Sequence, residues 1–217
     1  MADLIPDPMR AARLVLSLRR QGVTDDGVLT ALETVDRGVF VAPHLSSMVA
    51  EDCALPIPCG QSIPRPIVTA KLLRALQVSP GKQERVLLIG SGSGYTAALL
   101  SQISRHVYGI ERYERLVEQS RQRLSDLAVE NVSIRHGNGL TGLQEHGPYD
   151  RILLTGAVKT IPAVLIEQLG KGGLLVTPIE TSSGPQILRT VSKSKDVIDE
   201  PMPDRLALLS EGISQRL

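Results

Sequence analysis

From residue 85 onward, short apolar runs alternate with longer amphipathic segments. The apolar runs predict strands near 85–89, 106–111, 131–135, 150–155 and 173–178. The segments between them predict helices near 94–104, 112–127 and 160–169. Such alternation is typical of an α/β protein with a mostly parallel sheet and helices on both faces. Segments near 186–192 and 205–210 are predicted to add antiparallel edge strands, which gives a seven-stranded, Rossmann-like sheet.

The first 80 residues predict helices that cover one end of this sheet. A helix is expected over about 8–20, with Gly22 as its stop. Thr24-Asp25-Asp26 then offers a cap for a second helix through Val35. A third helix is expected to open at Pro66 and to end near Val78.

Between these helices lies AEDCALPIPCGQSIPRP, residues 50–66, with four prolines and one glycine. This composition predicts an extended loop without regular secondary structure. Long loops inside compact domains are often functional, so we expect this one to meet a ligand. The 217 residues are expected to form a single domain. Within it, residues 1–80 hold the N-terminal helices and the substrate loop, and 81–217 hold the Rossmann-like core.

Composition argues against several classes of partner. The formal net charge is +1, there is no Trp, and aromatic residues make up 2%, so we expect no nucleic-acid partner. No apolar run approaches ~18 residues, and MADLIPDPMR lacks a signal-peptide core, so we expect no membrane partner and a cytoplasmic location. Two cysteines and four histidines without metal-ligand spacing predict no metal site.

The turn that follows the first core strand contains Gly90, Gly92 and Gly94, spaced G-x-G-x-G. Glycines suit such a turn because the backbone must bend sharply and approach a ligand without a Cβ in the way. The dinucleotide fingerprint needs a glycine where Tyr95 stands, and a P-loop needs a Gly-Lys-Ser/Thr ending that is absent. The turn therefore predicts a nucleotide-like ligand of another kind.

Two further turns are expected at the same edge of the sheet. Glu111 ends the second core strand, 17 positions after Gly94 (111 − 94), where an acid can accept hydrogen bonds from ribose hydroxyls. His136-Gly137-Asn138-Gly139 follows the third strand and is placed to touch an adenine edge. These three turns together resemble those of the class I S-adenosylmethionine-dependent methyltransferases.

Longer stretches resemble one family of these enzymes, the protein-L-isoaspartate O-methyltransferases. ALPIPCGQSIPRP resembles the family's Leu-Pro-Ile followed by Gly-Gln-Thr-Ile-Ser-x-Pro. QGVTDDGVLTALETVDRGVFV, NVSIRHGNGLTG and PYDRILLTGAVKTIPAVLIEQLGKGGLLVTPI resemble its N-terminal helices, its Asn-Val…Gly-Asp-Gly stretch and its fourth and fifth strand regions. The resemblance covers roughly residues 10–180, and the last 35 or so residues match poorly.

The resemblance implies transfer of a methyl group from S-adenosylmethionine to the α-carboxylate of isoaspartyl residues in damaged proteins or peptides. It implies that the donor is held by residues of the three turns, namely Gly90, Ser91, Gly92, Gly94, Glu111, Gly137, Asn138 and Gly139. It also implies that Gln61, Ser62 and Ile63 cover the donor and that Ser62 and Ile63 meet the substrate. Thr69, one turn into the following helix, is a further candidate donor contact.

Three positions depart from the family's pattern. Leu88 stands where the family has an acid, Asn138 where it has Asp, and Pro64 where it has its active-site Ser. We expect Leu88 to cost about 1–3 kcal/mol of donor affinity and Asn138 about 1 kcal/mol.

Proline has neither a hydroxyl nor a backbone N–H, so the change at Pro64 removes two possible donors to a carboxylate. Ser62 is then the predicted catalytic hydroxyl, and Arg65 is a candidate for binding the substrate carboxylate bidentately.

Other functions stay open on the sequence alone. The chain is consistent with a divergent methyltransferase that acts on another carboxylate or small nucleophile, or with a non-catalytic module that retains the fold. A dinucleotide-binding dehydrogenase is disfavoured by Tyr95. The sequence gives no indication of the oligomeric state.

Overall fold

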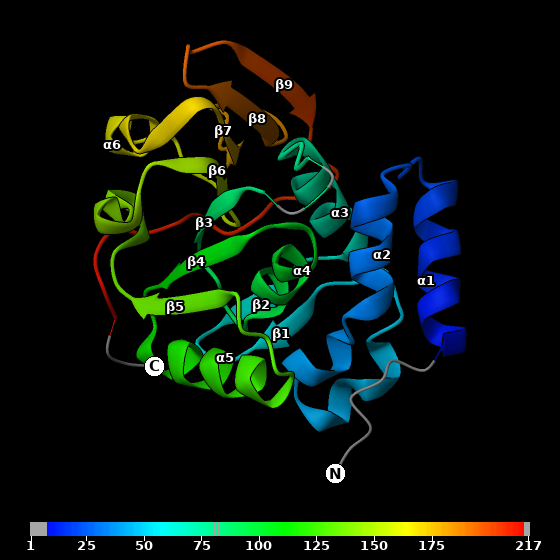
Figure 1. Ribbon diagram of the computed structural model, residues 1–217. Coiled ribbons are helices and arrows are strands. Elements are labelled where there is room, and N and C mark those ends of the chain that lie inside the picture. The colour runs from blue at the N-terminus through cyan, green and yellow to red at the C-terminus, as the bar shows by residue number, and fades with distance from the viewer. Residues whose placement is uncertain (1–7, 80, 82, 215–217) are drawn as a thin grey trace.

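The computed structural model describes residues 8–79, 81 and 83–214, and its centre is a seven-stranded sheet (Figure 1). The strand order is β5-β4-β3-β6-β7-β8-β9. The strands are β3 (Arg85–Ile89), β4 (His106–Glu111), β5 (Val132–His136), β6 (Tyr149–Leu154), β7 (Leu169–Ile179), β8 (Ile187–Ser192) and β9 (Val197–Pro201). Neighbours from β5 to β7 are parallel, whereas β8 and β9 pair antiparallel. The predicted Rossmann-like α/β class is confirmed.

Helices cover both faces of the sheet. Those of the core are α4 (Tyr95–Ile103), α5 (Glu114–Asp126) and α6 (Ala163–Glu167), with short 3-10 turns η3 (Gly139–Thr141) and η4 (Gln144–His146). The N-terminal part forms α1 (Pro8–Arg20), α2 (Asp26–Thr34), η1 (Arg37–Phe40), η2 (Pro43–Met48) and α3 (Pro66–Ala75). The α2 helix packs on α3 and α4, and α1 lies outside α2 (Figure 1).

Two of the helix starts that the sequence predicts are present in the N-terminal part. The Asp25 side chain accepts a hydrogen bond from the Val28 N–H, so the cap residue directly precedes α2. Pro66 occupies the first turn of α3, where its missing N–H costs nothing. No helix among the described residues has the length and apolarity that crossing a bilayer requires.

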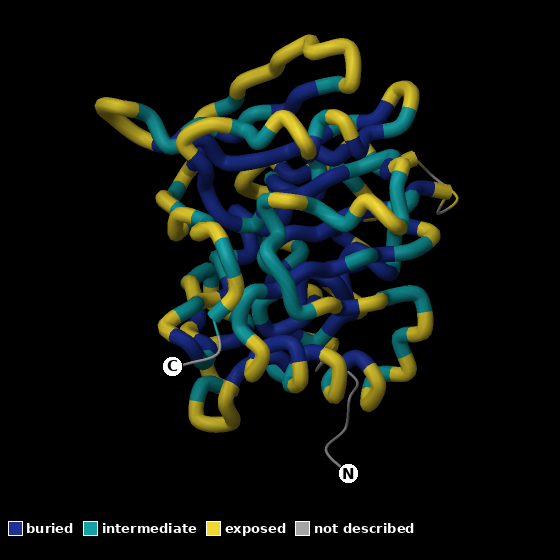
Figure 2. The backbone as a smooth tube through the Cα atoms, turned by 90° about the vertical axis from the view of Figure 1, so that its left-hand side faces the viewer, coloured by how far each residue is buried: buried dark blue, intermediate teal, exposed yellow. Residues whose placement is uncertain are grey.

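The two faces of the sheet bury separate hydrophobic clusters because side chains alternate along each strand. Val86 and Leu88 of β3 join the cluster that contains α1 to α5, whereas Leu87 and Ile89 join the cluster under α6. The central strand β3 and the second half of β6 are deeply buried, whereas β9 at the edge of the sheet is mostly exposed (buried residues are dark blue in Figure 2).

Two predictions about secondary structure are wrong. The segment 50–66 is not free of regular structure, because β1 (Leu55–Ile57) and β2 (Gln61–Ile63) pair as an antiparallel hairpin. Cys59 and Gly60 both adopt φ of 63° in its turn. A two-stranded hairpin leaves one side of each strand unpaired, so Pro56 removes no required hydrogen bond.

The second error concerns the last strand, which is Val197–Pro201 and not 205–210. A tight turn after β8, closed by the hydrogen bonds from Ser192 N to Asp196 O and from Lys195 N to Ser192 O, returns the chain at once as β9. Residues 202–214 then run across the carboxyl ends of the sheet (Figure 1, red), and we call them the C-terminal strap.

The core position of Leu88 makes its contribution to stability testable. Its side chain is fully buried (0% exposed) in the larger cluster. We expect Leu88→Ala to lower the free energy of unfolding by about 2–5 kcal/mol, measured by urea denaturation, because a cavity remains in a packed core. Leu16→Ala, at a position 55% exposed on α1, is the control and should change it by less than about 0.5 kcal/mol. Equal effects of the two substitutions would contradict this packing.

Candidate active site

A pocket opens where β3 and β4 end, and four separate parts of the chain form its main walls. These are the β1–β2 hairpin with Pro64, the glycine turn from Ile89 to Ser93, the end of β4 from Ile110 to Tyr113, and residues 206–210 of the strap. Carboxyl ends of parallel strands are the usual ligand-binding edge of open α/β sheets.

The glycine turn has the backbone that the sequence predicts. Gly90, Gly92 and Gly94 all adopt positive φ, at 83°, 55° and 94°. A Cβ on Gly90 would lie 2.6 Å from the Thr155 Oγ1, so a side chain there would have to displace a neighbour. Gly94 serves another purpose, since a Cβ there would lie 3.0 Å from the Cβ of Ser120 on α5. Gly90 and Gly92 therefore line the pocket, whereas Gly94 lets α4 approach α5.

Glu111 is held in place by backbone N–H groups at the pocket wall. One carboxylate oxygen accepts a hydrogen bond from Gly92 N at 2.8 Å, and the other accepts from Arg112 N at 2.7 Å and Tyr113 N at 3.1 Å. A carboxylate offers about four acceptor positions, so capacity for a further donor remains. Glu111 therefore presents an oriented, ionisable acceptor to the pocket.

Two hydroxyl groups of pocket-lining residues are buried without a hydrogen-bond partner. They are Ser91 Oγ in the glycine turn and Tyr95 OH at the start of α4. Burial raises the pKa of Tyr95 above its ordinary value, so the phenol is neutral. Both residues line the pocket, although their hydroxyl oxygens are themselves buried from solvent.

The three turns do not contribute equally. Gly139 and the following Leu140 line the pocket, but Gly137 and Asn138 do not lie on its wall. The Asn138 Oδ1 instead accepts a hydrogen bond from Leu140 N at 3.1 Å and caps the short η3 turn. Thr69 also lies off the wall, buried in α3 with its Oγ1 unpartnered.

Leu88 likewise lies behind the wall. The pocket is lined by Ile89, whereas Leu88 points into the opposite face of the sheet. Leu88 therefore makes no direct contact with a ligand in the pocket, and the predicted loss of donor affinity cannot arise from such a contact.

The hairpin brings three candidate residues to the pocket. Gln61, Ser62 and Ile63 all line it, and Ser62 is exposed there. Pro64 lines the pocket as well. The only side-chain hydroxyl that the stretch 60–64 presents is therefore that of Ser62, two residues before the position predicted from the family pattern.

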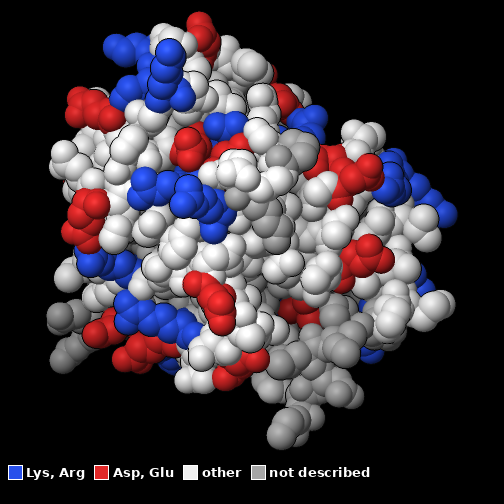
Figure 3. Space-filling view, in the orientation of Figure 1, with Lys and Arg blue, Asp and Glu red and all other residues white. Residues whose placement is uncertain are grey.

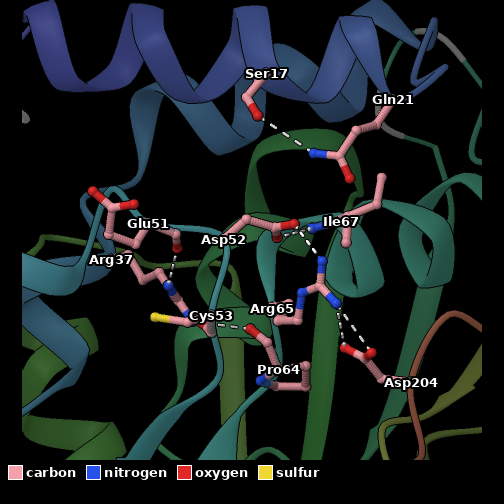
Figure 4. Close-up of polar contacts among 10 residues, drawn as sticks. All are labelled: Ser17, Gln21, Arg37, Glu51, Asp52, Cys53, Pro64, Arg65, Ile67 and Asp204. Carbon is pink, nitrogen blue, oxygen red and sulfur yellow. Dashed lines mark hydrogen bonds and ion pairs between the residues drawn. The ribbon is translucent and has the colours of Figure 1, made fainter.

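Arg65 is placed differently from the prediction. It does not lie on the pocket wall, and its guanidinium binds Asp52 at 2.7 Å and Asp204 at 3.1 Å (Figure 4). The hydrogen bond to Asp52 is the main cause that raises the pKa of Arg65, which keeps it cationic. Because Arg65 already forms ion pairs with two carboxylates, this geometry does not support it as the residue that binds a substrate carboxylate.

Sequence reasoning missed Arg37, a buried arginine that fixes the hairpin from behind. Its side chain is 3% exposed and donates to the carbonyl oxygens of Cys53 at 2.7 Å and Pro64 at 3.0 Å (Figure 4). Burial is the main cause that lowers the pKa of Arg37. The sequence does not show this role, because the carbonyl groups that Arg37 binds lie 16 and 27 positions away along the chain.

Sequence reasoning also missed the strap as a pocket wall. Ala157 N donates to Ala207 O and Leu209 N donates to Ala157 O, both at 2.8 Å. A Cβ on Gly156 would lie 2.8 Å from the Ala207 oxygen, so the strap lies tightly against the turn after β6. No signal in the sequence of 206–210 distinguishes such a strap from an edge strand.

Comparison with known proteins gives a consistent result at the level of sequence. A family model described as Protein-L-isoaspartate(D-aspartate) O-methyltransferase matches residues 9–202. A Parvibaculum lavamentivorans protein-L-isoaspartate O-methyltransferase is 41% identical over 93% of this chain and 92% of its own length. A Paracoccus denitrificans protein of the same name is 41% identical over 99% of this chain and 100% of its own length.

Solved structures agree with this assignment. A protein-L-isoaspartate O-methyltransferase structure superposes with a TM-score of 0.79 at 26% identity, covering 91% of this chain and 65% of that one. A Plasmodium falciparum structure that bears the name beta-aspartate methyltransferase, in complex with S-adenosyl-L-homocysteine, gives a TM-score of 0.76 at 27% identity over 91% and 96% of the two chains. This chain belongs to the protein-L-isoaspartate(D-aspartate) O-methyltransferase family.

Proposed function

We propose that this protein transfers the methyl group of S-adenosylmethionine to the α-carboxylate of L-isoaspartyl residues in proteins and peptides. The observation that carries the proposal is the pocket itself, in which the glycine turn and Glu111 face the hairpin that presents Ser62. Family membership and the two relatives at 41% identity support the same activity. The methyl ester formed on an isoaspartyl residue cyclises to a succinimide that reopens partly to aspartate, which makes the reaction a repair step.

The residues of the pocket fit S-adenosylmethionine. Gly90 and Gly92 leave room for close approach of a ligand to the backbone, and the unpartnered Ser91 Oγ lies beside them. Glu111 is the candidate for the ribose hydroxyls, and Gly139 with Leu140 is the candidate for the adenine side. When bound, the donor supplies a methyl group already activated on a sulfonium.

The residues of this chain then have a modest task. A carboxylate is ionised and nucleophilic at pH 7, so no strong general base is needed to activate it. The chain must align the carboxylate with the methyl group and exclude water. Ser62 can donate a hydrogen bond that orients the carboxylate, and Ile63 supplies an apolar, buried neighbour. Pro64 has no hydroxyl and no N–H, so it cannot donate a hydrogen bond to the carboxylate.

A second candidate function follows from Pro64. Loss of the hydroxyl and N–H at this position changes the part of the pocket that would meet the substrate, which is consistent with methylation of a different carboxylate. The same donor pocket serves both candidates, so only the substrate distinguishes them.

We propose that the substrate is a protein or peptide and that the protein acts in the cytoplasm. The two cysteines, Cys53 and Cys59, are both free thiols, which suits a reducing compartment. On the face that Figure 3 shows, Lys and Arg side chains are interspersed with Asp and Glu. Such mixing supports a peptide partner over a polyanion such as nucleic acid, which would favour a surface of one positive sign.

The direct test is methyl transfer from labelled S-adenosylmethionine to an isoaspartyl peptide. We expect incorporation into this peptide and none into the otherwise identical peptide with normal aspartate. Calorimetry with S-adenosylhomocysteine on the same preparation reports donor binding separately. Donor binding without methylation of the isoaspartyl peptide would exclude the proposed substrate and favour the second candidate.

Glu111 gives a prediction about donor affinity. We expect Glu111→Gln to weaken S-adenosylhomocysteine binding by roughly ten- to a hundredfold, because hydrogen bonds to a charged acceptor contribute about 1.5–3 kcal/mol. Calorimetry measures the dissociation constant. Glu114→Gln, at an exposed position three residues later, is the matched control and should leave it unchanged. If both variants bind S-adenosylhomocysteine with the same affinity, Glu111 does not contact the donor.

Pro64 gives a prediction about the substrate side. We expect Pro64→Ser to raise kcat/KM for the isoaspartyl peptide by about tenfold, because it restores one hydroxyl and one N–H to the pocket wall. Donor affinity should stay the same. Ser62→Ala should lower kcat/KM in the parent chain but matter less in the Pro64→Ser background. A Ser62→Ala variant with undiminished kcat/KM would show that this hydroxyl has no catalytic role.

A further inference from the structure

The pocket is closed on one side by the hairpin and on another by the strap, and these two walls are far apart in the sequence. Residues 60–64 form the first wall and residues 206–210 form the second. The residue that joins them is Arg65, which follows the first wall directly and binds Asp204, two residues before the second.

The Arg65 guanidinium lies between two carboxylates and binds both. Arg65 NH1 donates to both oxygens of Asp204, at 3.1 and 3.3 Å, and NH2 donates to Asp52 at 2.7 Å. The other Asp52 oxygen accepts from Ile67 N at 3.3 Å, which ties the same carboxylate to the first turn of α3 (Figure 4). A planar guanidinium suits this role because it donates in two directions at once.

The backbone around Arg65 is also restrained. It lies between Pro64 and Pro66, and its φ and ψ of −54° and 146° are those that a following proline favours. Arg37 holds the Pro64 carbonyl from the opposite side at 3.0 Å. The hairpin end is therefore held by contacts that do not involve the strap, and Arg65 adds a contact from this end to the strap.

Residues 205–209 of the strap have several other attachments, which hold them to the turn after β6 and to the segment between β7 and β8. Leu206 exchanges two backbone hydrogen bonds with the Gln186 side chain, Arg205 pairs with Glu180, and Ala157 bonds the backbone of residues 207 and 209. Asp204 lies just before these attachments, and its contact with Arg65 is the one that reaches the residue next to Pro64.

We propose that Arg65 is a positioning residue that latches the C-terminal strap to the hairpin through Asp204 and thereby sets the substrate entrance of the pocket. Its effect on substrate rests on the proposed function, whereas the latch itself does not. Loss of the latch loosens the strap around residue 204, where it meets the hairpin, while residues 205–209 keep their other attachments, so substrate binds more weakly. The chemical step is affected less, because Ser62 and the glycine turn keep their own anchors.

The experiment compares Arg65→Gln, Asp204→Asn and the double variant in the full chain. The matched control is Arg189→Gln, because the Arg189–Asp199 pair joins β8 to β9 with similar side-chain exposure and lies outside the pocket wall. Asp52 is left unchanged because it also binds Ile67 N.

The first measurement is amide hydrogen exchange across 202–214 without any substrate. We expect about three- to fivefold faster exchange in both single variants, the size that a partly exposed ion pair gives. The double variant should exchange no faster than either single variant, and Arg65→Lys should lie between because it keeps one ion pair at a time. Exchange equal to that of the parent chain in both single variants would overturn the latch, whether or not the protein methylates isoaspartyl peptides.

The second measurement is the kinetics of peptide methylation. We expect KM for the peptide to rise by a similar factor in both single variants, with kcat changed by less than about twofold. The control should match the parent chain. If KM rises in Arg65→Gln but not in Asp204→Asn, Arg65 binds the substrate directly and the latch is wrong. If no variant methylates the peptide, the parent chain included, the proposed function fails while the exchange result still decides the latch.

Discussion

The pocket depends on hydrogen bonds that join the turn after β3 to the end of β4. Gly90 N and Ser91 N donate to the Ile110 carbonyl at 2.9 and 3.2 Å, and Gly92 N donates to the Glu111 carboxylate at 2.8 Å. These bonds require the positive φ of the turn, which glycine adopts without strain. They also fix the Glu111 carboxylate on the pocket wall. One set of contacts therefore shapes the floor of the pocket and orients its principal acceptor.

Two arginines then determine where the other walls stand. Arg37 is buried behind the hairpin and satisfies the carbonyl oxygens of Cys53 and Pro64, which a loop of this composition leaves without backbone partners. Arg65 is partly exposed and binds two carboxylates from different parts of the chain. A guanidinium with several directed donors can hold irregular backbone where a sheet or helix cannot. Both residues act through other groups, and neither lies on the pocket wall.

Much of this architecture is predictable from residue patterns. The bounds of α1, β3 and β4 agree with the predicted segments, because α1 has a helical period and the two strands are short apolar runs that end at turns. The glycine turn and the acid beside it are predictable as pocket residues for a similar reason: Gly90, Gly92 and Glu111 are local to strand ends, and the sheet brings strand ends together. Asn138 and Leu88 show where that reasoning stops, since side-chain direction places one in a cap and the other in the core.

The sequence by itself determined the α/β class, the glycine turn, the acid that faces it and the family to which the chain is similar. These properties depend on periodicity and on residues close together along the chain. Tertiary structure alone decided that Arg65 binds Asp204, 139 positions away, and that residues 206–210 line the pocket instead of extending the sheet. Contacts of this kind depend on where two distant segments come to lie, and neither segment carries a local pattern that specifies its partner.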